Sequence, residues 1–174
     1  GLCLNVTAGI GVLGQASAMI QETFHGMVGP LAAAGFVGLM SLFNMGGRFV
    51  WATVSDYIGR KTTYAVFFVL GTVLYLTVPH AGEIGSVPLF VVCFLIIISM
   101  YGGGFSTVPA YLKDMFGTSY VGAIHGLVLT AWSAAGIFGP VLVNYISAYQ
   151  VAHNVSKADS YNLPMYIMAV LLVI

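Results

Sequence analysis

The chain has 174 residues, of which 59% are hydrophobic and 6% are charged, and its mean hydropathy is +0.98. Soluble domains carry about 25% charged residues, so this composition excludes a soluble globular domain and indicates a polytopic helical membrane protein. The formal net charge is zero, which excludes the basic face that nucleic-acid binding requires. We therefore expect the lipid bilayer, and no nucleic acid, among its partners.

The first three predicted membrane helices run from Leu2 to Phe24, from Leu31 to Ser55 and from Thr62 to Val78. A helix rises about 1.5 Å per residue, so segments of this length can cross a hydrocarbon core of about 30 Å. The third segment is apolar around almost its whole circumference, which predicts a helix that faces lipid.

The last three predicted helices run from Leu89 to Thr107, from Thr118 to Tyr149 and from Leu163 onward. The fifth is too long for one straight span, and Gly139-Pro140 is expected to break or kink it. About twelve residues remain for the sixth, so we expect that span to be cut off. The sequence thus predicts an all-α polytopic transmembrane bundle in which residues 1–174 form one six-helix domain.

Positive charges gather in two predicted turns, where Arg60 and Lys61 follow the second helix and Lys113 follows the fourth. The opposite side of the membrane has only Lys157, so the positive-inside rule places the two turns in the cytoplasm. Gly59 is expected to close the second helix in a left-handed conformation.

Three consecutive glycines, Gly102-Gly103-Gly104, interrupt the fourth predicted helix. Each costs about 1 kcal/mol relative to alanine, so the triplet predicts a local distortion or the close approach of a neighbouring helix. Tyr101 and Phe105 flank it on one face, four residues apart. They either pack within the bundle or form an aromatic wall of a substrate cavity.

Arg48 lies about two turns inside the second predicted helix, with Asn44 on the same side. A charged side chain inside the membrane costs from about 2.5 kcal/mol upward unless it is compensated. Arg48 either reaches the cytoplasmic boundary or an acid elsewhere in the protein, or it faces a cavity and binds a substrate carboxylate. The guanidinium group suits the second role because it matches a carboxylate through two parallel hydrogen bonds.

The stretch from Asp56 to Lys61, between two apolar helices, resembles the loop signature of the major facilitator superfamily of secondary transporters. Ala52 and Tyr57 stand where that family usually has a glycine and a basic residue. Four further stretches resemble the second half of the oxalate/formate antiporter family: Asn5-Val6-Thr7-Ala8-Gly9-Ile10-Gly11, Tyr101-Gly102-Gly103-Gly104-Phe105, Tyr120-Val121-Gly122-Ala123-Ile124-His125-Gly126 and Thr130-Ala131-Trp132.

The resemblance implies the second six-helix half of a major facilitator fold, whose first, N-terminal half is missing from this chain. Gly136 to Pro140, however, is similar to a motif in the fifth helix of drug antiporters, which would indicate a first half. The resemblance also implies a cytoplasmic conformational gate formed by Asp56, Gly59, Arg60 and Lys61. In this gate the Asp56 carboxylate is expected to dock at the start of the fifth helix near Thr118, where unpaired N–H groups leave a partial positive charge.

In the oxalate/formate family the helix that corresponds to the second one here carries a substrate-binding arginine, and Arg48 is at the matching place. That family's oxalate exchanger has a lysine where this chain has Trp132, so one deep cation remains and a monoanion is favoured over a dianion. The Trp132 N–H group could donate to a carboxylate oxygen. His125, seven residues earlier, is either a packing residue or a proton carrier.

We therefore expect a transporter, in a bacterial cell membrane, that moves a small organic anion (a monocarboxylate, or one like formate or oxalate) by alternating access. Its expected substrate-binding residues are Arg48, Trp132, Tyr101, Phe105 and Asn44. Carriers of drugs or sugars are the main alternative within the superfamily. A membrane enzyme or a non-transport subunit is disfavoured because no catalytic cluster or Cys/His ligand set is evident. No cofactor or metal is expected.

Overall fold

The computed structural model describes residues 2–24, 26–157 and 159–173, with side chains from residue 6 onward. Its helices are α1 (Leu2–Thr23), α2 (Pro30–Ile58), α3 (Arg60–Glu83), α4 (Val87–Phe116), α5 (Val121–Ala152) and α6 (Asn162–Val173), with a short 3-10 helix η1 (Asp159–Tyr161) before α6. The predicted all-α bundle of six helices is confirmed. Within the described ranges, α2, α3, α4 and α5 are each long and apolar enough to cross a membrane.

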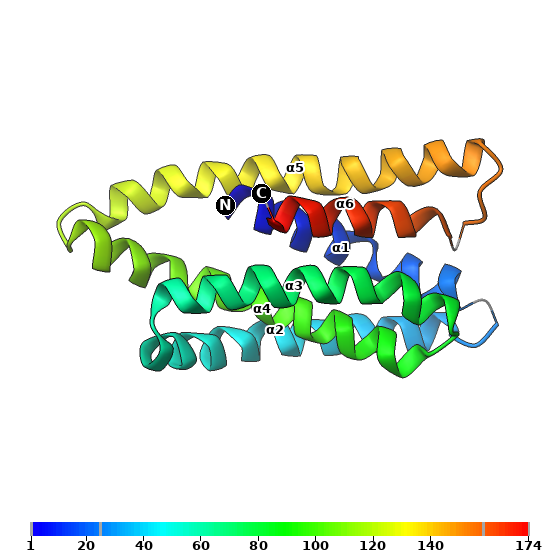
Figure 1. Ribbon diagram of the computed structural model, residues 1–174, viewed down its shortest axis with the longest axis horizontal. Coiled ribbons are helices and arrows are strands. Elements are labelled where there is room, and N and C mark those ends of the chain that lie inside the picture. Colours follow the sequence, from blue (N-terminus) through cyan, green and yellow to red (C-terminus); the bar gives the residue numbers. More distant parts are fainter. Residues whose placement is uncertain (1, 25, 158, 174) are drawn as a thin grey trace.

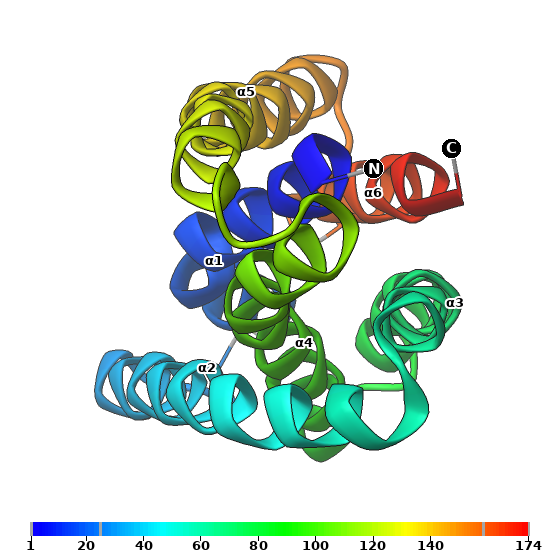
Figure 2. The same cartoon turned by 90° about the vertical axis from the view of Figure 1, so that its left-hand side faces the viewer.

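Successive helices run in opposite directions along the long axis of the bundle (Figure 1). The α2–α3 and α4–α5 turns lie at one end, so Arg60, Lys61 and Lys113 share the end that we expect in the cytoplasm. Viewed from that end, α1 and α4 occupy the centre, α5 and α2 lie on opposite sides, and α3 and α6 share one flank (Figure 2). The main packing pairs are α2 with α4, α1 with α5, and α3 with both α4 and α6.

Glycines let α2 and α4 pack backbone to backbone. A Cβ atom at Gly47 would lie 2.7 Å from the Ser99 Cα atom, and one at Gly103 would lie 2.5 Å from the Trp51 Cβ atom. Real Cβ atoms essentially never come this close, so these positions exclude any larger residue unless the helices separate. The glycine triplet was expected to cause either a local distortion of the helix or the close approach of a neighbour. Because α4 is helical throughout the triplet, the structure confirms the close approach.

Three prolines, Pro79 in α3, Pro109 in α4 and Pro140 in α5, lie inside helices instead of ending them. α4 continues through Pro109 to Phe116, so the expected end of the fourth helix at Thr107 is wrong. α5 is continuous across Pro140, which excludes a break there and leaves the kink, the other expectation, as a prediction. Membrane helices tolerate proline where nearby groups satisfy the surrounding carbonyls.

The third helix has one apolar face that is exposed and another that is buried. Phe67 and Tyr75 on α3 are completely buried, whereas Val69 and Val73 are exposed. The buried face packs against α4 and α6, whereas the exposed face is compatible with the predicted contact with lipid, which stays a prediction. Both surroundings favour apolar side chains, so the sequence pattern did not show which face is which.

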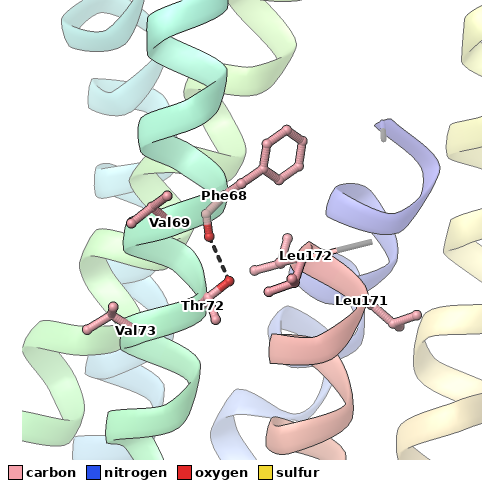
Figure 3. Close-up of a pocket in the computed structure, with 7 residues that line it drawn as sticks. Phe68, Val69, Thr72, Val73, Leu171 and Leu172 are labelled. Carbon is pink, nitrogen blue, oxygen red and sulfur yellow. Dashed lines mark hydrogen bonds between the residues drawn. The ribbon is translucent and has the colours of Figure 1, made fainter.

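An open cavity of about 460 Å³ lies between α3 and α6 (Figure 3). Its lining is aliphatic and aromatic apart from Thr72, whose hydroxyl donates to the Phe68 carbonyl at 2.7 Å. Its volume suits a small molecule, but it offers no charged group that could recognise an anion. This cavity is therefore not a candidate site for an anion.

Candidate functional site

The Arg48 side chain is exposed on α2 and extends over an aromatic ring of α4. Its Cζ atom lies 5.8 Å from the centroid of the Phe105 ring, within the range of about 6 Å over which a cation is attracted to a ring face. The Ser106 hydroxyl donates to the Arg48 carbonyl oxygen at 2.9 Å and ties the two helices together at this level. In the described part of the chain, Arg48 forms no ion pair with a carboxylate.

Three aromatic side chains continue from Arg48 across α4 to α5. The Phe105 ring meets the Tyr101 ring edge to face at 5.2 Å and the Trp132 ring edge to face at 5.1 Å. The geometry is the one that aromatic quadrupoles prefer. Four of the five expected substrate-binding residues thus form one group on three helices, which we call the arginine–aromatic cluster (Arg48, Tyr101, Phe105 and Trp132).

The polar hydrogens of this cluster are arranged differently from the expectation. The Trp132 Nε1–H group donates to the Tyr101 hydroxyl oxygen at 3.3 Å, so in this conformation the indole points at the tyrosine and not at a substrate. The Tyr101 hydroxyl has no recorded acceptor among the described residues, which leaves its O–H hydrogen available. Tyr101 is 8% exposed and Trp132 is 41% exposed, so the indole forms the outer edge of the cluster.

A cavity of about 20 Å³ lies against the inner side of the cluster, lined by Val6, Tyr101, Gly104, Phe105, Val108, His125, Val128, Leu129 and Trp132. His125 enters it from α5, and its Nδ1 atom is buried without a hydrogen-bond partner in the described part of the chain. The seven-residue spacing from Trp132 gave the signal for this placement, because residues seven apart return to nearly the same helix face.

Asn44, the fifth expected residue, does not line that cavity. A Cβ atom placed at Gly102 would lie 2.6 Å from the Asn44 Oδ1 atom, so this side chain points into the contact between α2 and α4. Its Oδ1 atom is buried without a recorded hydrogen-bond partner among the described residues. Asn44 thus lies in the contact between α2 and α4, next to Gly102, and its role in substrate binding stays a prediction.

A second polar group, which we call the Arg60 cluster (Asp56, Arg60 and Asp114), lies at the expected cytoplasmic end. Arg60 pairs with Asp56 at the end of α2, and its Nε atom lies 3.5 Å from the Asp114 Oδ2 atom at the end of α4. Asp114 was missed by the sequence analysis, because nothing in the sequence shows that the end of α4 lies beside the α2–α3 turn. Lys61 is exposed and forms no ion pair among the described residues.

The turn geometry also departs from the expectation. Gly59 has a positive φ of 86°, but its ψ of 150° is extended, which places it in a region that only glycine populates and outside the left-handed helical region. No side chain caps the start of α5 at Tyr120, and the Asp56 carboxylate is held by Arg60. The expected docking of Asp56 on the fifth helix is therefore not seen in this conformation.

Comparison with known proteins places the chain among transporters. The family model described as Major Facilitator Superfamily matches residues 1–174. The chain is 35% identical over 103 residues (59% of this chain, 24% of the relative) to the oxalate:formate antiporter of Oxalobacter formigenes. It is 26% identical over 125 residues (71% and 18%) to apicoplast pyruvate carrier 2 of Toxoplasma gondii, and 33% identical over 106 residues (59% and 17%) to an efflux pump of Gibberella moniliformis. These matches span about a quarter or less of the length of these relatives, and no solved structure matches.

Proposed function

The chain belongs to the major facilitator superfamily, and on this premise we propose that it is part of a secondary transporter that moves a small organic anion by alternating access. The observation that carries the proposal is Arg48, a guanidinium with no carboxylate partner among the described residues, beside a wall of aromatic rings. Relatives named for the antiport of oxalate and formate and for the carriage of pyruvate support a small carboxylate as the substrate.

The energetics favour an anion at Arg48. An arginine inside the membrane costs from about 2.5 kcal/mol upward, whereas a cation–π contact such as that with Phe105 returns about 0.5–2 kcal/mol. A carboxylate would offset the remainder, because it neutralises the charge and accepts two hydrogen bonds from the guanidinium fork. In this proposal, the Tyr101 O–H group would give the carboxylate a further hydrogen bond. A single carboxylate fits one cation, so the proposed preference is for a monocarboxylate.

The exposed surfaces of α2 and α5 support a second set of helices as the partner. Large apolar side chains on both helices are exposed, among them Leu42, Phe49, Leu127, Phe138 and Tyr145. We infer that the other six-helix half of the transporter covers part of this surface, so that Arg48 and Trp132 face the substrate path between the halves. Asp56, Gly59, Arg60 and Lys61 would then belong to a gate at the cytoplasmic end. The bacterial relative supports a bacterial cell membrane as the location.

A counterflow assay tests the proposal on the full-length transporter reconstituted in liposomes, with labelled formate, pyruvate, lactate and oxalate. Arg48→Lys should lose at least about tenfold in apparent affinity, because a point charge does not replace the guanidinium fork. Arg48→Gln should lose uptake altogether. Lys113→Gln removes the same charge from the exposed C-terminal end of α4 and is the matched control, which should transport as the wild type does. Full uptake by Arg48→Gln at normal expression would contradict the proposal.

The similarity to an efflux pump favours one second candidate, the export of an apolar compound. The aromatic rings of the cluster could stack on such a compound without using Arg48. Export of an uncharged drug that is insensitive to Arg48→Gln, with no counterflow of the four anions, would support this candidate over the first.

A further inference from the structure

Gly9 on α1 packs against the ring of Tyr101 on α4. A Cβ atom at Gly9 would lie 2.3 Å from the Tyr101 Cδ2 atom and 3.0 Å from its Cγ and Cε2 atoms. Real Cβ atoms essentially never come as close as 2.3 Å, so the ring occupies its place only because position 9 has no side chain. Gly9 is not among the residues that the proposed function uses.

The Tyr101 ring has little free space around it. Tyr101 forms a buried group with Val6 of α1 and Ala135 of α5, and Ile10 and Phe105 pack against this group. Two cavities of about 20 Å³ each adjoin Tyr101, one lined by α1, α4 and α5 and the other by α1, α3, α4 and α6. Each has room for about one water molecule, so neither can take up a displaced aromatic ring.

A methyl group at position 9 would therefore disturb the arginine–aromatic cluster. The edge of the Tyr101 ring would have to withdraw by about 1 Å to reach an ordinary contact of 3.4 Å. Closely packed interiors transmit such a shift to their neighbours. The neighbours are the Trp132 Nε1–H group, which donates to the Tyr101 hydroxyl oxygen at 3.3 Å, and the Phe105 ring, whose centroid is 5.2 Å away. The hydrogen bond is already long, so a displacement of this size would disrupt it.

Resting on the proposed function, we propose that Gly9 is a positioning residue that sets the size limit of the anion site through the Tyr101 ring. Glycine lets the ring lie back against α1, so the aromatic wall beside Arg48 admits a carboxylate that carries a short carbon chain. A larger residue at position 9 pushes the ring away from α1 and narrows that space. Formate needs the least room, whereas pyruvate and lactate each have two further carbon atoms. Gly9 thus determines which carboxylates fit, and Arg48 determines that they are anions.

The test is a competition measurement on the full-length transporter in liposomes, with pyruvate or lactate against labelled formate. Gly9→Ala should lower the affinity for pyruvate and lactate relative to formate by about tenfold, because differences of one methylene group in an apolar pocket have effects of this size. Binding of formate by this variant should still require Arg48. A change in the ratio is a readout that a merely destabilised bundle would not produce.

Two other glycines of α1 provide matched controls. A Cβ atom at Gly14 would meet only the Pro140 Cγ atom, at 4.0 Å, so Gly14→Ala should behave as the wild type does. A Cβ atom at Gly11 would meet atoms of α5 and α6 at 3.1 to 3.2 Å, and none of them belongs to the arginine–aromatic cluster. Gly11→Ala therefore introduces strain elsewhere on the same helix and should keep the wild-type ratio, whatever its effect on stability.

A ratio in Gly9→Ala that matches the ratio in Gly11→Ala would overturn this inference and leave the proposed function intact, provided that transport still requires Arg48. If Gly9→Ala does not fold, the double variant Gly9→Ala/Tyr101→Ala should fold and show the ratio of Tyr101→Ala alone, because the ring atoms that the methyl group would meet are absent. A double variant that does not fold, or whose ratio differs, would show that Gly9 acts without Tyr101 and would also overturn the inference. If the wild type transports none of these anions, both the inference and the proposed function are wrong.

Discussion

Replacing Gly47 by alanine should destabilise the transporter, whereas the same change at the neighbouring Gly46 should not. A Cβ atom at position 47 would lie 2.7 Å from both the Ser99 Cα and carbonyl carbon atoms. These are backbone atoms of α4, which cannot rotate away as the end of a side chain can. At position 46, a Cβ atom would meet nothing within 4 Å. Both variants therefore add one methyl group to α2, but only the methyl group at position 47 would collide with α4.

The magnitude follows from two opposing effects. Overpacking a tight contact costs about 1–3 kcal/mol, and a backbone neighbour places Gly47→Ala at the upper end. Replacing glycine by alanine inside a helix returns up to about 1 kcal/mol. We expect Gly47→Ala to lose about 2 kcal/mol in the free energy of unfolding and Gly46→Ala to be neutral or slightly more stable. Because Arg48 follows Gly47, moving α2 away from α4 should also carry the guanidinium away from Phe105 and weaken anion binding.

Equilibrium unfolding of the full-length protein in mixed micelles with increasing denaturing detergent measures the first effect, and anion binding at equilibrium measures the second. The slope of each transition must match the wild type for the midpoints to be compared. Equal midpoints for Gly46→Ala and Gly47→Ala would refute the reasoning, because they would show that α2 and α4 are not in backbone contact at this level.

Two further predictions concern the ends of the bundle. Arg60→Gln should slow turnover by a few fold and leave equilibrium anion binding intact, because exposed ion pairs such as those of the Arg60 cluster contribute about 0.2–1 kcal/mol each. Lys113→Gln, which removes an exposed cation outside the proposed gate, is the control, and equal turnover in the two variants would exclude a gating role for Arg60. At the other end, burial and the Glu22 carboxylate raise the pKa of Tyr161 from 10.0 to about 12. Since the folded state holds this proton more tightly, the associated stability is complete below about pH 10 and is lost as the pH rises toward 12. Thermal unfolding scans across this range should show a steeper decline for the wild type than for Tyr161→Phe.

Much of the candidate site could be predicted from spacing along single helices. Tyr101 and Phe105 are four residues apart and His125 and Trp132 are seven apart, so each pair was expected to share a face. The contacts between different helices could not be predicted from these spacings. The Trp132–Tyr101 hydrogen bond, the ion-pair distance between Arg60 and Asp114, and the turn of Asn44 toward Gly102 depend on the rotation and depth of one helix against another.

The sequence by itself determined the class of this protein, because few charges and long apolar runs leave the bilayer as the one solvent in which such helices are stable. It also indicated the positions of the turns through glycine and charge, except that α4 runs on to Phe116 where an end at Thr107 was expected. Only the tertiary structure decided which helix faces are buried and which polar groups meet. In lipid the hydrophobic effect does not distinguish a buried face from an outer one, so an apolar helix such as α3 carries no sequence signal for its own orientation. The orientation of a helix is fixed instead by close packing at small residues such as Gly47. This packing arises only when two helices are in contact, so a single helix sequence does not reveal it.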